Sequence, residues 1–292
     1  MAIYSKELLL KLSRIAMIGD VVGEFGLKTL EEKLPILIKE QNIDFVTVNG
    51  ENSAAGFGMS PVDFKRIMAA GANVVTSGNH IWENREFWSV LETEPNMLRP
   101  ANYPKGSTVI QSVSGAGFAC INKNHISYIV LNLQGREFMS AIDCPFQCFD
   151  RMLSIHIGRA AENHPIVSGD GTSIPTAFPI IIIDFHAESS REKEALGYYV
   201  DGRASLIAGT HTHVQTADER ILPKGTAYIT DLGMTGNTDS VIGMDPKICF
   251  ERSTKQVLYH METAESNKPG QMQGIIAEID AETGNAVSIR RI

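Results

Sequence analysis

Short runs of β-branched and aliphatic residues alternate along the chain with longer stretches in which apolar positions recur every three or four residues. The short runs are typical of buried strands, and the longer stretches are typical of helices that cross between parallel strands. Six strands are predicted in this way, at residues 15–22, 44–49, 73–76, 179–184, 206–209 and 227–230. The clearest helices cover residues 27–41 and 61–71, and the second ends at a glycine. The alternation predicts an α/β fold.

Two segments break this alternation, because each holds two neighbouring apolar runs separated by turn residues. Residues 117–134 are predicted to form an antiparallel hairpin that turns at residues 122–124. Residues 274–292 are predicted to form a second hairpin that turns near Thr283 and Gly284. The sheets are therefore expected to be mixed. No internal repeat and no linker rich in proline or serine divides the sequence, so residues 1–292 are expected to form a single domain.

Composition and charge narrow the range of partners. Hydrophobic residues make up 43% of the chain and charged residues 21%, as in ordinary globular proteins. The formal net charge of −8 argues against a basic face for sequence-specific nucleic-acid binding or for an anionic membrane. No apolar run approaches the roughly 18 residues of a membrane span. With only four cysteines and no secretory signal, a cytoplasmic protein with reduced thiols is expected.

Polar side chains that can bind metals lie at the ends of five predicted strands, where α/β sheets place their ligand sites. They are Asp20 on the first strand, Glu51 and Asn52 after the second, Asn79 and His80 after the third, His186 after the fourth, and His211 and His213 after the fifth. Taken singly, each has an ordinary explanation, such as a turn residue or a helix cap. Together, these carboxylate, amide and imidazole groups suit two divalent metal ions.

These motifs resemble those of the calcineurin-like metallophosphoesterases, and they are most similar to the branch of YmdB-type bacterial phosphodiesterases. The motifs are Gly-Asp-Val-Val-Gly at 19–23, Asn-Gly-Glu-Asn at 49–52, Ser-Gly-Asn-His at 77–80, Asp-Phe-His-Ala-Glu at 184–188 and Gly-Thr-His-Thr-His-Val-Gln-Thr-Ala-Asp at 209–218. The resemblance covers about residues 15–290. It implies a mixed-sheet metallophosphoesterase fold, in which two packed β-sheets are flanked by helices. It also implies hydrolysis of small or cyclic phosphodiesters, such as 2′,3′-cyclic nucleotides.

The resemblance implies a particular set of metal ligands. One ion would be bound by Asp20, Glu51, Asn52 and His213, and the other by Glu51, Asn79, His186 and His211. Glu51 would then bridge the two ions, which would be iron or manganese by resemblance, with zinc also suited to such ligands. Asn52 replaces a histidine that most members of the superfamily carry two residues after the first aspartate. Ile81 stands where an acid commonly follows Gly-Asn-His, so the acidic partner of His80 stays open, with Glu83 nearby.

The chemistry expected of such a site is hydrolysis of a phosphoric ester. Two divalent ions can share a hydroxide that attacks phosphorus. His80 is adjacent to Asn79 but is not itself an implied ligand, so it is the candidate general acid for the leaving oxygen. Asp184 and Glu188 flank His186 and either fix its tautomer or cap the next helix.

The choice between diester and monoester substrates depends on cations near the site. A monoester carries about two negative charges near neutral pH and usually requires arginine or lysine beside the metals. No motif contains such a residue, and the nearest in sequence are Lys65, Arg85, Arg191 and Arg203, which favours a diester. Two alternatives stay open: a phosphomonoesterase of the protein-phosphatase kind, and a non-catalytic regulatory protein that binds metal or nucleotide. Members of the family often form dimers or tetramers, so a homo-oligomer is also implied.

Overall fold

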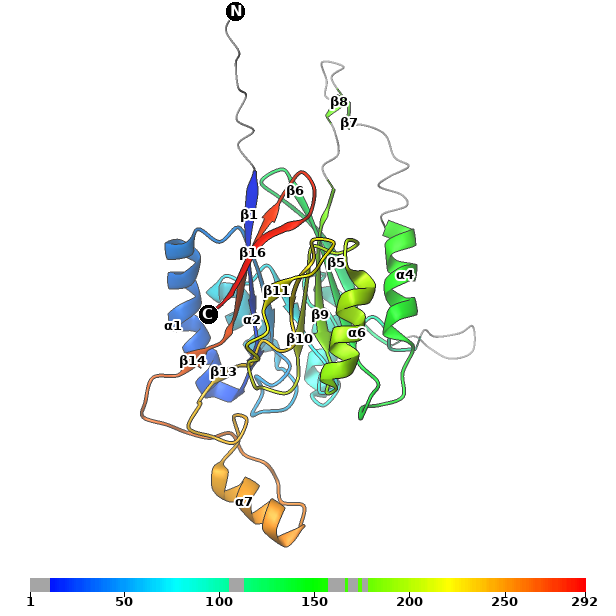
Figure 1. Ribbon diagram of the computed structural model, residues 1–292. Coiled ribbons are helices and arrows are strands. Elements are labelled where there is room, and N and C mark those ends of the chain that lie inside the picture. Colours follow the sequence, from blue (N-terminus) through cyan, green and yellow to red (C-terminus); the bar gives the residue numbers. More distant parts are fainter. Residues whose placement is uncertain (1–10, 105–112, 157–165, 168–172, 175–177) are drawn as a thin grey trace, which may run out of the picture.

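The computed structural model describes residues 11–104, 113–156, 166–167, 173–174 and 178–292. Two main sheets lie face to face, and helices cover the outer face of each sheet (Figure 1). This gives four layers in the order helix, sheet, sheet, helix. The fold expected from the sequence, two packed mixed sheets flanked by helices, is confirmed.

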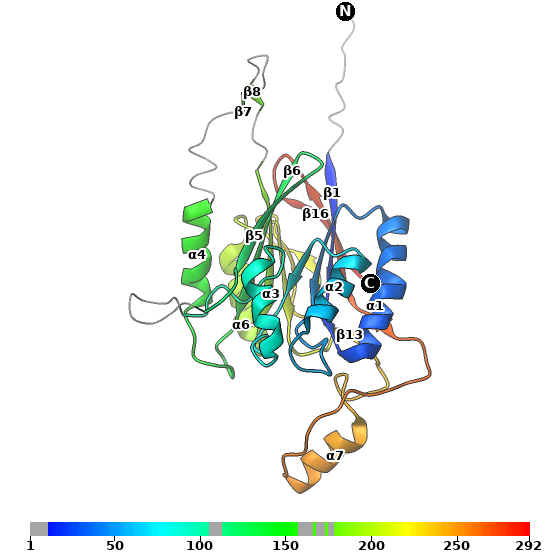
Figure 2. The same ribbon diagram turned by 180° about the vertical axis from the view of Figure 1, so that it is seen from behind.

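The first sheet has five strands in the order β16-β15-β1-β3-β4. Their bounds are Leu12–Ile18 for β1, Phe45–Asn49 for β3, Val74–Thr76 for β4, Gly274–Asp280 for β15 and Ala286–Arg291 for β16. β1, β3 and β4 run parallel, whereas the C-terminal hairpin of β15 and β16 pairs antiparallel with β1. Two helices, α1 (Gly23–Gln41) and α2 (Pro61–Ala70), pack on its outer face (Figure 2).

The second sheet has six strands in the order β11-β12-β10-β9-β6-β5. Their bounds are Phe118–Lys123 for β5, Ile126–Gln134 for β6, Ile180–His186 for β9, Leu206–Thr210 for β10, Arg220–Ile221 for β11 and Ala227–Ile229 for β12. The four central strands run parallel, and β5 and β11 are antiparallel edges. The helices α4 (Pro145–His156) and α6 (Ser190–Val200) cover the outer face of this sheet.

The apolar core between the two sheets explains the continuous hydrophobic runs in the sequence. Every residue of β9 is buried, because one face of the strand packs against the first sheet and the other against α6 and α4. A strand buried on both faces needs apolar residues at successive positions rather than at alternate ones. Across the interface, the rings of Phe45 on β3 and Tyr128 on β6 stack with their centroids 4.2 Å apart.

Several smaller elements complete the chain. A three-stranded sheet is formed by β2 (Asp20–Val21), β13 (Met234–Gly236) and β14 (Gln271–Met272), and two short strands, β7 (Ile166–Val167) and β8 (Ser173–Ile174), pair with each other. The 3₁₀ helix η1 (Arg85–Phe87) leads into α3 (Trp88–Thr93). The helix α7 (Pro246–Lys255) stands away from both sheets, at the bottom of Figure 1, and none of its residues is buried. None of the described helices combines the length and apolar character needed to cross a membrane.

The predicted elements differ from the observed ones in two places. The predicted strand at 15–22 is interrupted, because β1 ends at Ile18 and β2 pairs instead with β13. At the break, the main chain passes so close to Gly233 that a Cβ on Gly19 would lie 2.1 Å from the Gly233 carbonyl oxygen. The first hairpin turns at Asn124 and His125, which have φ values of 52° and 63°, rather than at 122–124. The helix predicted to stop at Gly71 does so, with Gly71 at φ 118°.

Candidate active site

The predicted ligands meet at one edge of the two-sheet core, although they are far apart in sequence. β3, β4, β9 and β10 all direct their carboxyl ends to this edge, since neighbouring strands within each sheet are parallel. Asn49 pairs with Thr76 in the first sheet and His186 pairs with Thr210 in the second. The polar residues that follow these positions therefore converge from both sheets.

Three of the predicted ligands lie around Nε2 of a fourth, His186. Glu51 Oε1 lies 2.8 Å from this atom, His211 Nδ1 lies 2.9 Å away and Asn79 Oδ1 lies 3.2 Å away. One ligand atom from each of Glu51, His186 and His211 lies within 4.8 Å of the other two, so these three residues could hold a metal ion. With Asn79, these three residues are the four ligands that the resemblance implied for the second ion.

The remaining predicted ligands lie beside this group. His213 Nε2 is 3.3 Å from Asn52 Oδ1 and 4.0 Å from Asp20 Oδ1. Asp20 Oδ1 is also 3.8 Å from Nδ1 of His186, so Asp20 lies between the two groups of ligands. Although it is fully buried, Asp20 Oδ1 accepts no hydrogen bond within the described part of the chain. A buried carboxylate oxygen without a donor is costly unless a cation compensates it.

Burial and the attraction between opposite charges shift the pKa values of the ionisable groups in the site. Burial raises the pKa of Asp20 to about 6. Burial would also raise the pKa of Glu51, but the adjacent His186 outweighs it and lowers that pKa to about 2. Burial opposes the charging of His186, yet Glu51 and Asp20 raise its pKa to about 9. The carboxylates favour a proton on His186, which would compensate their charge. A divalent cation held by the same oxygen and nitrogen atoms would do the same, so the residues fit the expected metals.

Hydrogen bonds on the far side of the rings of His186 and His213 direct their Nε2 atoms toward the other ligands. Thr210 donates its hydroxyl proton to Asp184 Oδ1 at 2.7 Å, so the Thr210 oxygen accepts from Nδ1 of His186 at 3.0 Å. In the same way, Nδ1 of His213 donates to the Ile242 carbonyl at 2.8 Å. Each ring therefore keeps its Nε2 for a ligand, as metal-binding histidines commonly do.

The sequence left open whether Asp184 and Glu188 orient His186 or cap the next helix, and the structure distinguishes these roles. Asp184 acts on His186 indirectly, through Thr210, and is buried. Glu188 does not contact His186, but its Oε2 lies 3.2 Å from His211 Nε2. Neither residue caps α6, whose N-cap is Ser189.

Gly78 is required for the close approach of ligands from the two sheets. A Cβ at this position would lie 2.3 Å from His186 Nε2 and 2.4 Å from Glu51 Oε2. Any side chain would therefore separate Glu51 from His186. The close packing around Gly78 therefore explains why a glycine precedes Asn79 in this motif.

His80 lies beside the ligand group and has an acidic partner. Its Nδ1 is 2.6 Å from Glu83 Oε1, which identifies the partner that the sequence left open. The edge of its ring packs against Phe57 with a centroid distance of 5.1 Å, and its backbone N–H donates to Glu51 Oε2 at 3.2 Å. The side chain is 24% exposed and lines the adjoining pocket.

A pocket of about 550 Å³ opens over the predicted ligands. Its floor is formed by Glu51, Asn52, His211 and His213, with His80 at the side. Its outer wall comes from Phe57, from α7 and from the segments before and after α7, and includes Arg252. Arg252 was not among the cations named from the sequence, because it lies in α7, which contains none of the motifs.

A buried ion pair supports the loop that carries His211 and His213. Lys193 Nζ on α6 lies 2.6 Å from Asp231 Oδ2, and both side chains are almost fully buried. The same oxygen accepts from the backbone N–H of Thr212 at 3.2 Å and from its hydroxyl at 2.8 Å. His211 and His213 both have positive φ values, of 100° and 64°, which are strained for residues other than glycine. The hydrogen bonds from Thr212 to Asp231 help to hold this strained segment in place. The sequence offered no signal for Lys193.

Substituting Lys193 with methionine should lower the free energy of unfolding by about 3–5 kcal/mol, because the Asp231 carboxylate would remain buried without its cation. Urea denaturation would measure the change. The control is Lys247→Ala on the exposed surface of α7, where a change within about 0.5 kcal/mol is expected. A loss below about 1 kcal/mol for Lys193→Met would show that the ion pair does not hold this region together.

Comparison with known proteins gives a consistent set of relatives. A family model described as "YmdB-like protein" matches residues 16–292. A Bacillus subtilis (strain 168) protein named 2′,3′-cyclic-nucleotide 2′-phosphodiesterase is 41% identical over 279 residues, which are 96% of each chain. The crystal structure of a hypothetical protein from Thermus thermophilus is 34% identical, with a TM-score of 0.79 over 96% of this chain and 98% of that one. The crystal structure of a Mycoplasma pneumoniae protein called a novel phosphatase is 28% identical, with a TM-score of 0.83 over 97% and 94% of the two chains.

Proposed function

The chain belongs to the YmdB-like family and is a phosphoric ester hydrolase, and from this premise we propose that it opens 2′,3′-cyclic nucleotides and related small phosphodiesters. The observation that carries the proposal is the convergence of the predicted ligands at one pocket floor, beside a histidine that is hydrogen-bonded to an acid and stands outside the ligand group. The activity named for the relative from Bacillus subtilis supports the choice of substrate.

Membership of the family implies divalent metal ions, and we assign two. Asp20, Glu51, Asn52 and His213 would hold one ion, and Glu51, Asn79, His186 and His211 would hold the other. Iron or manganese suits this mixture of oxygen and nitrogen atoms, and zinc is a further candidate. When bound, such ions neutralise the phosphate and acidify a water molecule that serves as the nucleophile.

His80 supplies the proton that the leaving oxygen needs. Glu83 accepts a hydrogen bond from Nδ1, so it fixes the orientation of the ring and leaves Nε2 to face the pocket. Water adds its oxygen to phosphorus and releases one proton to solvent, the bond from phosphorus to O2′ breaks, and Nε2 donates its proton to O2′. The product is a 3′-phosphate with a free 2′-hydroxyl. His80 recovers a proton from solvent before the next turnover.

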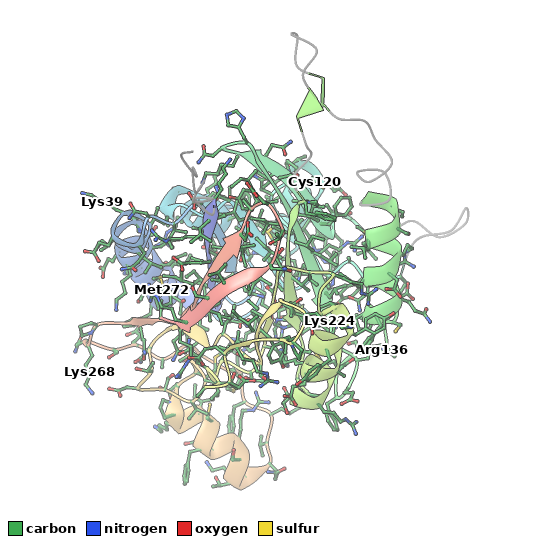
Figure 3. The ribbon with its side chains drawn as sticks, turned by 45° about the horizontal axis from the view of Figure 1, so that its top comes forward. Lys39, Cys120, Arg136, Lys224, Lys268 and Met272 are labelled. Carbon is green, nitrogen blue, oxygen red and sulfur yellow. The ribbon has the colours of Figure 1, made fainter. Side chains whose placement is uncertain are left out.

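The remaining properties of the protein follow from charge and packing. In Figure 3, the labelled Lys39 and Lys268 lie on the left of the molecule, and Lys224 and Arg136 lie on the right. The net charge of −8 supports a small substrate and no sequence-specific nucleic-acid binding. The shared core of the two sheets supports a single domain over residues 1–292. None of the four cysteines, all of which lie in the described ranges, forms a disulfide, and a cytoplasmic location and a homo-oligomer remain part of the proposal.

A phosphomonoesterase is the second candidate, and Arg252 is the observation that favours it. A guanidinium in the pocket would suit the second negative charge of a monoester. A purely regulatory binding protein is disfavoured, since it has no use for a histidine and glutamate pair beside the ligand group.

A comparison of substrates tests the proposal. At equal metal loading, kcat/KM for 2′,3′-cyclic AMP should exceed that for p-nitrophenyl phosphate by at least about tenfold, or about 1.4 kcal/mol in transition-state stabilisation. Bis(p-nitrophenyl) phosphate, a diester without a nucleoside, should also be hydrolysed. A clear preference for the monoester would replace the proposal with the second candidate.

A further inference from the structure

The outer wall of the active-site pocket differs in chemistry from its floor. The floor consists of acidic, amide and imidazole groups, whereas the wall is largely apolar. The apolar side chains of the wall are Phe57, Val241, Ile242, Met244, Cys249 and Met261. Arg252 of α7 lies among them, and Glu188, which lies beside His211, is a further charged residue of the lining. The pocket therefore has one end suited to phosphate and another suited to a flat, weakly polar group.

The guanidinium of Arg252 is available for a ligand. Its Nη1 donates to the Tyr259 carbonyl at 3.0 Å, which holds the side chain in place. No carboxylate in the described ranges forms an ion pair with it. A guanidinium has five N–H donors and a flat face, so most of its binding capacity is unused by the protein.

The size of the pocket and the position of its wall suit a nucleotide whose nucleoside part lies against the wall. A volume of about 550 Å³ lies within the range of roughly 300–1,000 Å³ that is typical of small-molecule sites. The phosphate of a bound nucleotide would lie over Glu51, Asn52 and the histidines, so the ribose and base would extend toward the wall. α7 stands away from the sheets in Figure 1 and bounds this outer end of the pocket. Apolar and guanidinium surfaces together are a common environment for nucleobases.

We propose that Arg252 and the apolar wall around it form the nucleoside subsite, in which the guanidinium contacts the base. The inference rests on the proposed function, because it assigns the part of the substrate that does not react. The wall then discriminates nucleotides from simple diesters, while the floor and His80 act on any diester that fits. Arg252 is a specificity residue and takes no part in proton transfer.

The test compares Arg252→Ala with Lys247→Ala, which removes the same charge from an exposed position on the same helix. For 2′,3′-cyclic AMP, Arg252→Ala should raise KM about 10- to 100-fold and change kcat little, as expected for loss of a base contact. For bis(p-nitrophenyl) phosphate, both constants should stay close to those of the unsubstituted protein. Metal content should be unchanged, and Lys247→Ala should resemble the unsubstituted protein with both substrates. Arg252→Lys keeps the charge but loses the flat face, so it should recover only part of the affinity.

Binding of the product provides a readout that does not depend on turnover. Calorimetry with adenosine 3′-phosphate should show the same 10- to 100-fold weakening in Arg252→Ala, whereas inorganic phosphate should bind equally well to both proteins. If Arg252→Ala lost equal affinity for adenosine 3′-phosphate and inorganic phosphate, or equal activity on both diesters, Arg252 would contact the phosphate. Either result would overturn the nucleoside subsite. Unchanged binding of adenosine 3′-phosphate would also overturn it. If the unsubstituted protein prefers a monoester, the proposed function fails, and this binding measurement still decides whether the subsite exists.

Discussion

Glu51→Gln should abolish hydrolysis and release metal in the same variant. Glu51 is buried between the two groups of ligands, with Oε1 2.8 Å from His186, and is the residue proposed to bridge both ions. Glutamine preserves the shape of the side chain but removes the charge, so the fold should persist while both ions lose a charged ligand. The metal ions would stabilise the transition state by several kcal/mol, so their loss should lower kcat/KM on the order of 10³-fold or more.

Metal analysis and kinetics on the same preparation would measure this effect. The control is Glu188→Gln, which removes a carboxylate 3.2 Å from His211 without removing a proposed ligand. This control should keep its metals and lose at most about 10- to 100-fold in affinity for them, as is usual for residues behind a ligand. Full activity in a Glu51→Gln protein shown to be free of metal would refute the metal-dependent interpretation of the site.

His80→Ala should reduce kcat on 2′,3′-cyclic AMP by about 10² to 10⁴, the usual contribution of general acid catalysis. Metal content should be unchanged, because His80 stands outside the ligand group and its hydrogen bond to Glu51 comes from its backbone N–H. The loss should shrink for bis(p-nitrophenyl) phosphate, since a nitrophenolate leaves without needing a proton.

Glu83→Gln is the matched variant for this mechanism. It keeps the size of the residue next to His80 Nδ1 but removes the charge, so the loss of kcat should be smaller than for His80→Ala. Loss of a metal from His80→Ala would instead make His80 a ligand. An equal loss for the two diesters would show that His80 does not protonate the leaving group.

The convergence of the site could be predicted from sequence because it depends on strand direction. Asp20 and His211 are 191 residues apart, yet the carboxylate of Asp20 accepts a hydrogen bond from the backbone of His211. Polar residues at the carboxyl ends of parallel strands must share an edge, and this rule needs only the strands and their order. It does not depend on the details of side-chain packing.

The residues that the sequence did not reveal depend on packing between distant elements. Lys193 resembles any surface lysine of a helix until α6 is placed against Asp231. Arg252 lies in a helix without buried residues, and its relation to the pocket depends on the path of the segments around α7. The interruption after β1 depends on β13, more than 200 residues later in the chain. Local patterns carry no information about such contacts.

The place of β15 beside β1 has a consequence for how the protein is made. Arg14 on β1 pairs with Glu278 on β15, 264 residues later, so β1 leaves the ribosome long before the strand that pairs with it. At synthesis rates of about 5–20 residues per second, β1 waits roughly 13–50 seconds for this neighbour. During that interval the strand exposes an apolar edge that invites pairing with other chains. The nascent protein therefore has a period in which a chaperone can protect this strand.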